Sequence, residues 1–115
     1  MKFATCEIPL FKRHVLAVID CSELEAVRYF QDYAKNKEKE QPLLETTIGN
    51  DGWCQCCGGD VYIWVEEEKY SIFIHEMVHA AFSLCELIGA EIDEEIIARL
   101  VEYMKINLLD TLEDQ

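Results

Sequence analysis

Hydrophobic positions along the chain show two spacings, one typical of strands and one typical of helices. The clearest strand candidate is 61–65, which is apolar at every position and follows a Gly-Gly-Asp turn sequence. An uninterrupted apolar run of this length predicts a strand that is buried on both faces. Segment 3–20 is also rich in β-forming residues and is interrupted by Pro9. We expect extended structure there, strongest over 14–19.

Helical spacing follows each of these segments. Ser22 is followed three residues later by Glu25, which is the pattern of a capping box at the start of a helix. A charged run predicts the end of this first helix. A second stretch, 70–88, is apolar on most sides, as expected of a central helix, and Gly89 predicts its end. The apolar stripe of 94–112 predicts a third helix.

The order of the predicted elements indicates the fold class. Between the first two helices, 43–48 is a short strand candidate, 49–52 has the composition of a turn, and 53–59 is expected to be a loop or the end of a hairpin. The order strand, helix, strand, strand, helix, helix predicts an α+β fold. A short mixed sheet of three or four strands would pack on the first helix and on helix 70–88. A length of 115 residues fits a single domain.

The charge balance narrows the classes of function. The chain has 10 Lys and Arg against 23 Asp and Glu, a formal net charge of −13. Nucleic acids and anionic membranes attract basic surfaces, so we expect this protein to bind neither. No stretch has the length and apolarity of a membrane span, and Glu7 and Pro9 interrupt what would be a signal peptide. These features predict a cytoplasmic protein.

One short motif contains residues that can bind a metal ion and transfer a proton. His75, Glu76 and His79 form the sequence His-Glu-x-x-His inside the predicted central helix. Residues four apart on a helix project from one face, so both imidazoles can reach one zinc ion at about 2.0–2.1 Å. The adjacent Glu76 is positioned to take a proton from water and to pass it to a leaving amine. The motif therefore predicts a catalytic zinc site.

A catalytic zinc site needs a third protein ligand and one open position. Acidic residues follow the motif in the turn and on the third helix. Glu95 and Glu102 lie seven residues apart on that helix and share a similar face. An antiparallel hairpin would bring Glu102 to the level of His79, whereas a wider crossing angle would favour Glu95. Spacing alone leaves both residues open as ligands.

Three stretches of the chain, 59–65, 74–80 and 88–103, resemble the small zincin-type proteins encoded by bacteriophages and prophages. These proteins have a strand, a His-Glu-x-x-His helix, a Gly turn and a second helix that opens with Glu-x-x-Ala-x-Leu. In that pattern the Glu of the second helix resembles the third zinc ligand of the gluzincins. The resemblance maps it onto Glu95, which is followed here by Ala98 and Leu100.

The resemblance implies a zinc metallopeptidase that hydrolyses a peptide or protein substrate in the cytoplasm of a bacterial host. His75, His79 and Glu95 would hold Zn²⁺, and Glu76 would be the general base. The strand before the motif helix, 61–65 or its neighbour, would form the rim of the cleft and bind an extended peptide by strand addition.

The chain departs from the family pattern at one position. The pattern often carries Tyr where this chain has Arg99. If that Tyr stabilises the transition state, then Arg99 or Tyr103 would have to take its place.

The cysteines are a second candidate site. Cys54, Cys56 and Cys57 are flanked by glycines and are candidates for a second metal. Structural zinc sites usually contain two pairs of cysteines with two residues between the members of each pair, and the chain does not contain two such pairs. A loop with reduced, metal-free cysteines is therefore the simpler interpretation.

Two other functions remain open at this point. One is a non-catalytic zinc-binding module of a phage or prophage that binds a host protein. The other is a thiol sensor, which would require exposed cysteines with a lowered pKa.

Overall fold

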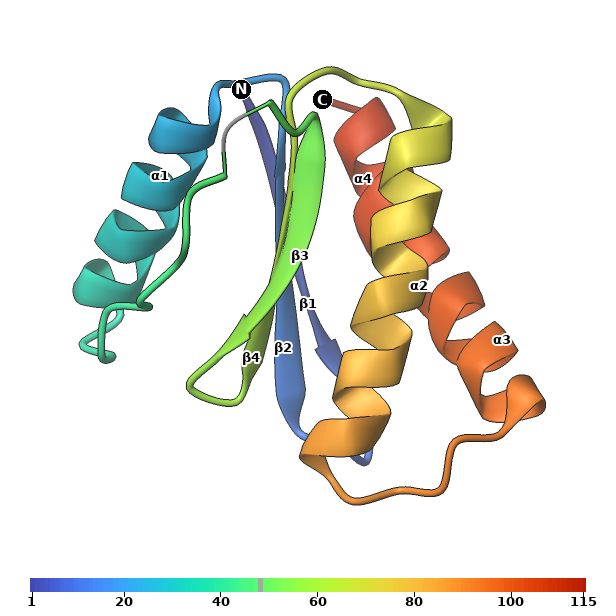
Figure 1. The fold of residues 1–115 in the computed structure, drawn as a ribbon. Coiled ribbons are helices and arrows are strands. Elements are labelled where there is room, and N and C mark those ends of the chain that lie inside the picture. Colours follow the sequence, from blue (N-terminus) through green and yellow to red (C-terminus); the bar gives the residue numbers. More distant parts are fainter. Residues whose placement is uncertain (48) are drawn as a thin grey trace.

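The computed structural model describes residues 1–47 and 49–115. A central sheet lies between two layers of helix: α1 (Glu23–Asn36) covers one face, and the helices of the C-terminal half cover the other (Figure 1). The small α+β domain with a mixed sheet is therefore confirmed.

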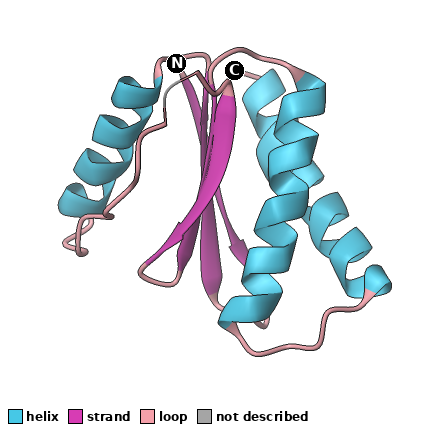
Figure 2. Ribbon diagram, in the orientation of Figure 1, coloured by secondary structure: helices cyan, strands magenta, loops and turns pink. Residues whose placement is uncertain are grey.

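The sheet has four strands in the order β1-β2-β4-β3. Figure 2 shows the strands between the helices on the two sides of the sheet. The strands are β1 (Lys2–Ile8), β2 (Arg13–Ile19), β3 (Gly52–Cys57) and β4 (Asp60–Val65). β2 and β4 are parallel, and each edge strand is antiparallel to its neighbour. The extended segment expected over 3–20 is a hairpin, because Pro9 lies in the turn between β1 and β2, where Leu10 and Lys12 have positive φ.

Strand β4 is central, as its apolar run predicts, and all five positions of 61–65 are buried. Of the two interpretations of 53–59, the end of a hairpin is confirmed and the loop is wrong, because 53–57 belongs to strand β3, which pairs antiparallel with β4. Gly58 and Gly59 both have positive φ and form the tight two-residue connection to β4.

The strand expected over 43–48 is wrong for 43–47, which has no regular secondary structure. Ile48 lies outside the described residues. Instead of joining the sheet by a backbone ladder, this segment bonds to side chains of β3. The Glu45 N–H donates to Gln55 Oε1 at 2.8 Å, and Gln55 Nε2 donates to the Glu45 carbonyl at 2.6 Å.

The helices begin close to where their caps predict. The capping box of α1 is complete, since the Ser22 side chain accepts from the Glu25 N–H and the Glu25 carboxylate accepts from the Ser22 N–H. The other helices are α2 (Tyr70–Leu87), α3 (Glu94–Met104) and α4 (Asp110–Glu113). A π-helical segment, Lys105–Leu109, joins α3 to α4, so the single helix expected over 94–112 changes its winding before it ends.

Side chains alternate between the two faces of each strand, so the buried residues form two clusters, one on each face of the sheet. Leu16 and Val18 of β2 face α1 and pack with Phe30. Val15 and Ala17 face the other way and pack with α2 and the C-terminal segment. In the part of the chain that the structure describes, no helix combines the length and apolarity needed to cross a bilayer.

Candidate metal centre

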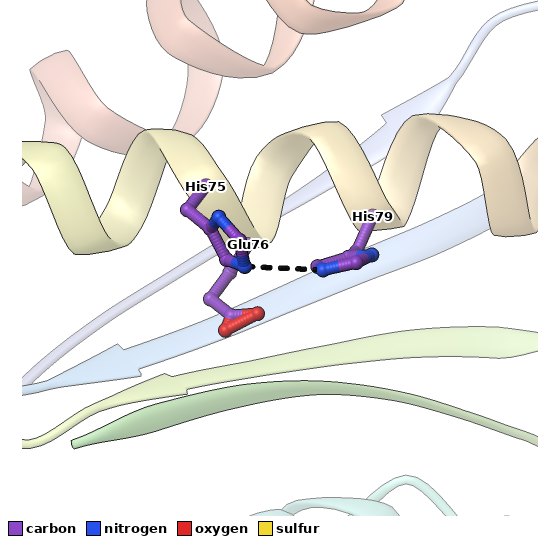
Figure 3. Close-up of side chains that lie close together, drawn as sticks. All are labelled: His75, Glu76 and His79. Atoms are coloured by element: carbon purple, nitrogen blue, oxygen red, sulfur yellow. Dashed lines mark hydrogen bonds between the residues drawn. The ribbon is translucent and has the colours of Figure 1, made fainter. Parts of the chain in front are cut away.

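Helix α2 brings His75, Glu76 and His79 together beside the sheet. One possible ligand atom of each lies within 4.8 Å of the others. The Nε2 atoms of the two histidines are 3.1 Å apart, and both rings project from the helix toward the strands (Figure 3). The i, i+4 spacing thus produces the paired imidazoles that the sequence predicts.

Packing of α2 fixes which way these side chains point. Met77 is fully buried against the sheet, and His75 and His79 lie at the margin of this contact, where they are exposed and line a groove beside β3. Glu76 is only 6% exposed, and its carboxyl projects toward the strands (Figure 3). Burial raises the pKa of Glu76, and the neighbouring His75 and His79 oppose that rise.

The three side chains line a groove between α2 and the start of β3. The lining residues are Asn50, Asp51, Gly52, Trp53, Cys54, Ser71, Ile72, His75, Glu76, His79 and Ser83. The expected rim strand 61–65 is interior, so its neighbour β3 forms the rim. Among the described strands β3 pairs with β4 and is an edge strand, and its first residues, 52–54, line the groove.

At Gly52, strand β3 lies close to both β4 and α2. A Cβ atom at this position would lie 2.8 Å from the Trp64 carbonyl oxygen and 3.2 Å from Ile72 Cγ2 on α2. Only glycine fits this contact without displacing a neighbour.

The spacing of the two imidazoles fits a shared metal ion. Two nitrogens bound tetrahedrally to one zinc at ~2.0–2.1 Å lie about 3.3 Å apart. The observed 3.1 Å between the Nε2 atoms is close to that separation. Two imidazole donors also suit a first-row transition metal, and Glu76 is the adjacent carboxylate of the cluster. The residues present therefore fit a metal ion, although they do not specify zinc.

The structure does not bring Glu95 or Glu102 into this group. Glu95 lies on the exposed surface of α3, where its carboxylate forms an ion pair with Arg99 Nε at 3.0 Å. Glu102 lines a different groove, between α2 and α3. The histidines project toward β3, whereas α3 packs on another side of α2 (Figure 3). The third helix therefore does not close the site as expected.

Arg99 and Tyr103 are also outside the groove that holds the histidines. Arg99 is held by Glu95 on the exposed surface of α3. The Tyr103 hydroxyl donates to the Glu7 carbonyl of β1 at 3.1 Å. Neither residue is placed to stabilise a transition state at His75 and His79.

The structure does not gather the three cysteines of β3. Adjacent strand positions face opposite sides of the sheet, so Cys54 packs with the α2 side and Cys57 with the α1 side. Burial, then the charge of Glu76, raises the pKa of Cys54 to about 12. The pKa of Cys56 is raised as well, mainly by desolvation. These shifts are opposite to what a thiol sensor requires.

Asp51 and Cys54 line the same groove as the histidines and were not predicted as part of that site. Asp51 belongs to a turn sequence whose composition is explained by the turn alone. Cys54 falls on a strand that the sequence pattern does not reveal. Only the pairing of β3 with β4 shows that both lie beside α2.

Comparison of the chain with protein-family models, with curated proteins and with solved structures finds no match. The zincin resemblance therefore rests on the motif and its flanking pattern.

Proposed function

We propose that this protein is a metal-dependent hydrolase, specifically a zinc metallopeptidase that cleaves peptide bonds. The observation that carries the proposal is the 3.1 Å approach of the His75 and His79 Nε2 atoms beside the buried Glu76 carboxyl. His75 and His79 would hold the zinc ion. A bound zinc ion supplies Lewis acidity, which polarises a carbonyl and makes water more acidic.

Glu76 is the general base in this proposal. Its carboxyl lies within 4.8 Å of both imidazole nitrogens and faces the groove between α2 and β3. From there it can accept a proton from a water molecule in the groove and return it to the departing amine. Packing of α2 against the sheet fixes the orientation of Glu76, so the base needs no rearrangement before it acts.

The part of the β3 edge that lines the groove, residues 52–54, supports an extended peptide as the substrate. A peptide that pairs with this edge would add a fifth strand to the sheet and would run past His75 and His79. Backbone hydrogen bonds would position the peptide with little demand on its side chains.

The proposal is tested by measuring metal content and peptide cleavage on the same preparations. Wild type, Glu76→Gln and His79→Ala are loaded with zinc, dialysed and analysed by mass spectrometry for metal and for cleavage of a peptide library. We expect wild type to hold one zinc and to cleave. Glu76→Gln should keep the zinc and lose cleavage by about 100-fold or more, because glutamine cannot accept the proton. His79→Ala should lose the metal.

His14→Ala is the matched control. His14 is the remaining histidine of the chain, and it lies near Glu7 and Asp60 on the sheet, outside the metal centre. This variant should bind zinc and cleave peptides like wild type. Cleavage that survives in Glu76→Gln would remove Glu76 from the mechanism.

A second candidate is a non-catalytic metal-binding module that binds a host protein. It is favoured by the small donor set, because the described residues contribute only His75, Glu76 and His79 to the cluster. Zinc bound by wild type with no cleavage of any library peptide would favour this candidate.

A further inference from the structure

A second groove runs between α2 and α3, and its lining is largely apolar. On α2 the lining side chains are Tyr70, Ile74, Val78 and Phe82, each four residues after the last. Ile97 and Val101 of α3 form the facing wall. Phe82 is 39% exposed, and Ile92, at one end of the groove, is 49% exposed. An exposed row of large apolar side chains of this kind is typical of an interaction site.

The size of the groove fits one helix. A row of four residues spaced by four along α2 extends over about 18 Å, or roughly three helical turns. The volume of the groove is about 790 Å³. An amphipathic helix with apolar side chains at every third or fourth position would place one stripe against both walls.

The rim of the groove is acidic. Glu94 and Glu102 line it from α3. The lining cation, Lys105, is already paired with Asp110 at 3.3 Å, and Arg99 on the same helix is paired with Glu95. Among the described residues no ion pair involves Glu94 or Glu102, and their carboxylates attract a partner that carries Lys or Arg beside its apolar stripe. A second copy of this chain is disfavoured as the occupant, because each copy carries a net charge of −13.

We infer that the groove between α2 and α3 is a docking site for a basic amphipathic helix of a partner protein. Val78 places this site on the motif helix itself, since it lies between Glu76 and His79 in sequence but faces α3. The inference does not depend on metal binding or on catalysis.

The test uses three fluorescent peptides of about 14 residues, roughly four helical turns. The first contains Leu and Lys, with Leu on one helical face. The second has the same composition in scrambled order, and the third has Glu in place of Lys. Fluorescence anisotropy with the full chain should show at least about tenfold tighter binding of the first peptide than of the other two, weakening as salt is added.

Variants of the protein locate the binding surface. Phe82→Ser and Ile92→Ser should each weaken binding of the first peptide, Phe82→Ser by about tenfold, because both remove apolar contact in the groove. Glu102→Gln should weaken it less and reduce its salt dependence. The matched control is Leu24→Ser, which removes a side chain that is 69% exposed on α1 and should leave binding unchanged. Circular dichroism checks that each variant is folded.

Three outcomes would overturn the inference. In the first, the scrambled peptide binds as well as the amphipathic one, so that charge alone explains binding. In the second, Leu24→Ser weakens binding as much as Phe82→Ser does. In the third, sedimentation shows a dimer of the free protein that Phe82→Ser dissociates, which would make a second copy the occupant.

Discussion

At the scale of single residues, burial determines which side chains are ionised. The Cys6 thiol lies on β1 in the core that faces α2, and burial raises its pKa to about 11. Burial also raises the pKa of Glu76, against the opposing charges of the two histidines. Glu76 differs from the core thiols because it borders a groove that water can enter. A buried carboxyl beside a groove is the arrangement that supports proton transfer.

The raised thiol pKa predicts alkaline destabilisation. In the unfolded chain Cys6 ionises near 9, and in the folded protein near 11, so the folded state keeps its proton over that interval. The contribution of Cys6 to stability is therefore complete below pH 9 and is lost as pH rises toward 11. Urea unfolding of wild type from pH 8 to 11 should show a falling free energy of unfolding, with a smaller slope in Cys6→Ala.

Val15→Ala is the control for the lost volume. Val15 pairs with Cys6 across β1 and β2 and has no titrating group. It should lower stability at every pH without changing the slope. An identical slope in Cys6→Ala and wild type would contradict the assignment.

At the scale of elements, the sequence predicts a helix or strand correctly where a local pattern of residues is typical of one element only. The capping box at Ser22 and the apolar run of β4 are local patterns, and both are confirmed. Strand β3 is not predicted as a strand because its apolar positions are few and divided, with Trp53 and Cys57 packing on the α1 side and Cys54 on the α2 side. The histidine pair follows from helical spacing alone. The place of Glu95 does not, because it depends on the packing of α3 against α2, which no local pattern encodes.

The effect of Glu95→Gln on zinc affinity tests whether α3 supplies a metal ligand. Its carboxylate is paired with Arg99 on the exposed surface of α3. We expect Glu95→Gln to change zinc affinity by less than about twofold, because an exposed i, i+4 pair of this kind contributes little. Competition with a chromogenic chelator measures the affinity, and His79→Ala provides the reference for a lost ligand. A loss in Glu95→Gln as large as that in His79→Ala would mean that α3 moves to the histidines when metal binds.

At the scale of the whole molecule, acidic charge is in excess. Much of the cationic charge is used in exposed pairs, among them Lys2 with Glu68 and Lys69 with Glu67. The remaining carboxylates share a surface of 6824 Å² and repel one another. This repulsion opposes the compact state and favours basic partners over acidic ones.

Salt should therefore stabilise the fold. Raising NaCl from 20 to 500 mM shortens the screening length from roughly 20 Å to about 4 Å, which weakens the repulsion among surface carboxylates. We expect the midpoint of thermal unfolding to rise by a few degrees, measured by differential scanning calorimetry. An equal osmolarity of glucose is the control for non-ionic effects. A midpoint that falls with NaCl would show that attractive ion pairs outweigh the repulsion.

The contact at Gly52 has a consequence for the groove that holds the histidines. Because a Cβ atom there would lie 2.8 Å from the Trp64 carbonyl oxygen, any larger residue must shift β3 against the backbone of β4. It would also press on Ile72 of α2, another residue that lines the groove. A substitution at position 52 therefore disturbs both walls of the groove in which His75 and His79 lie.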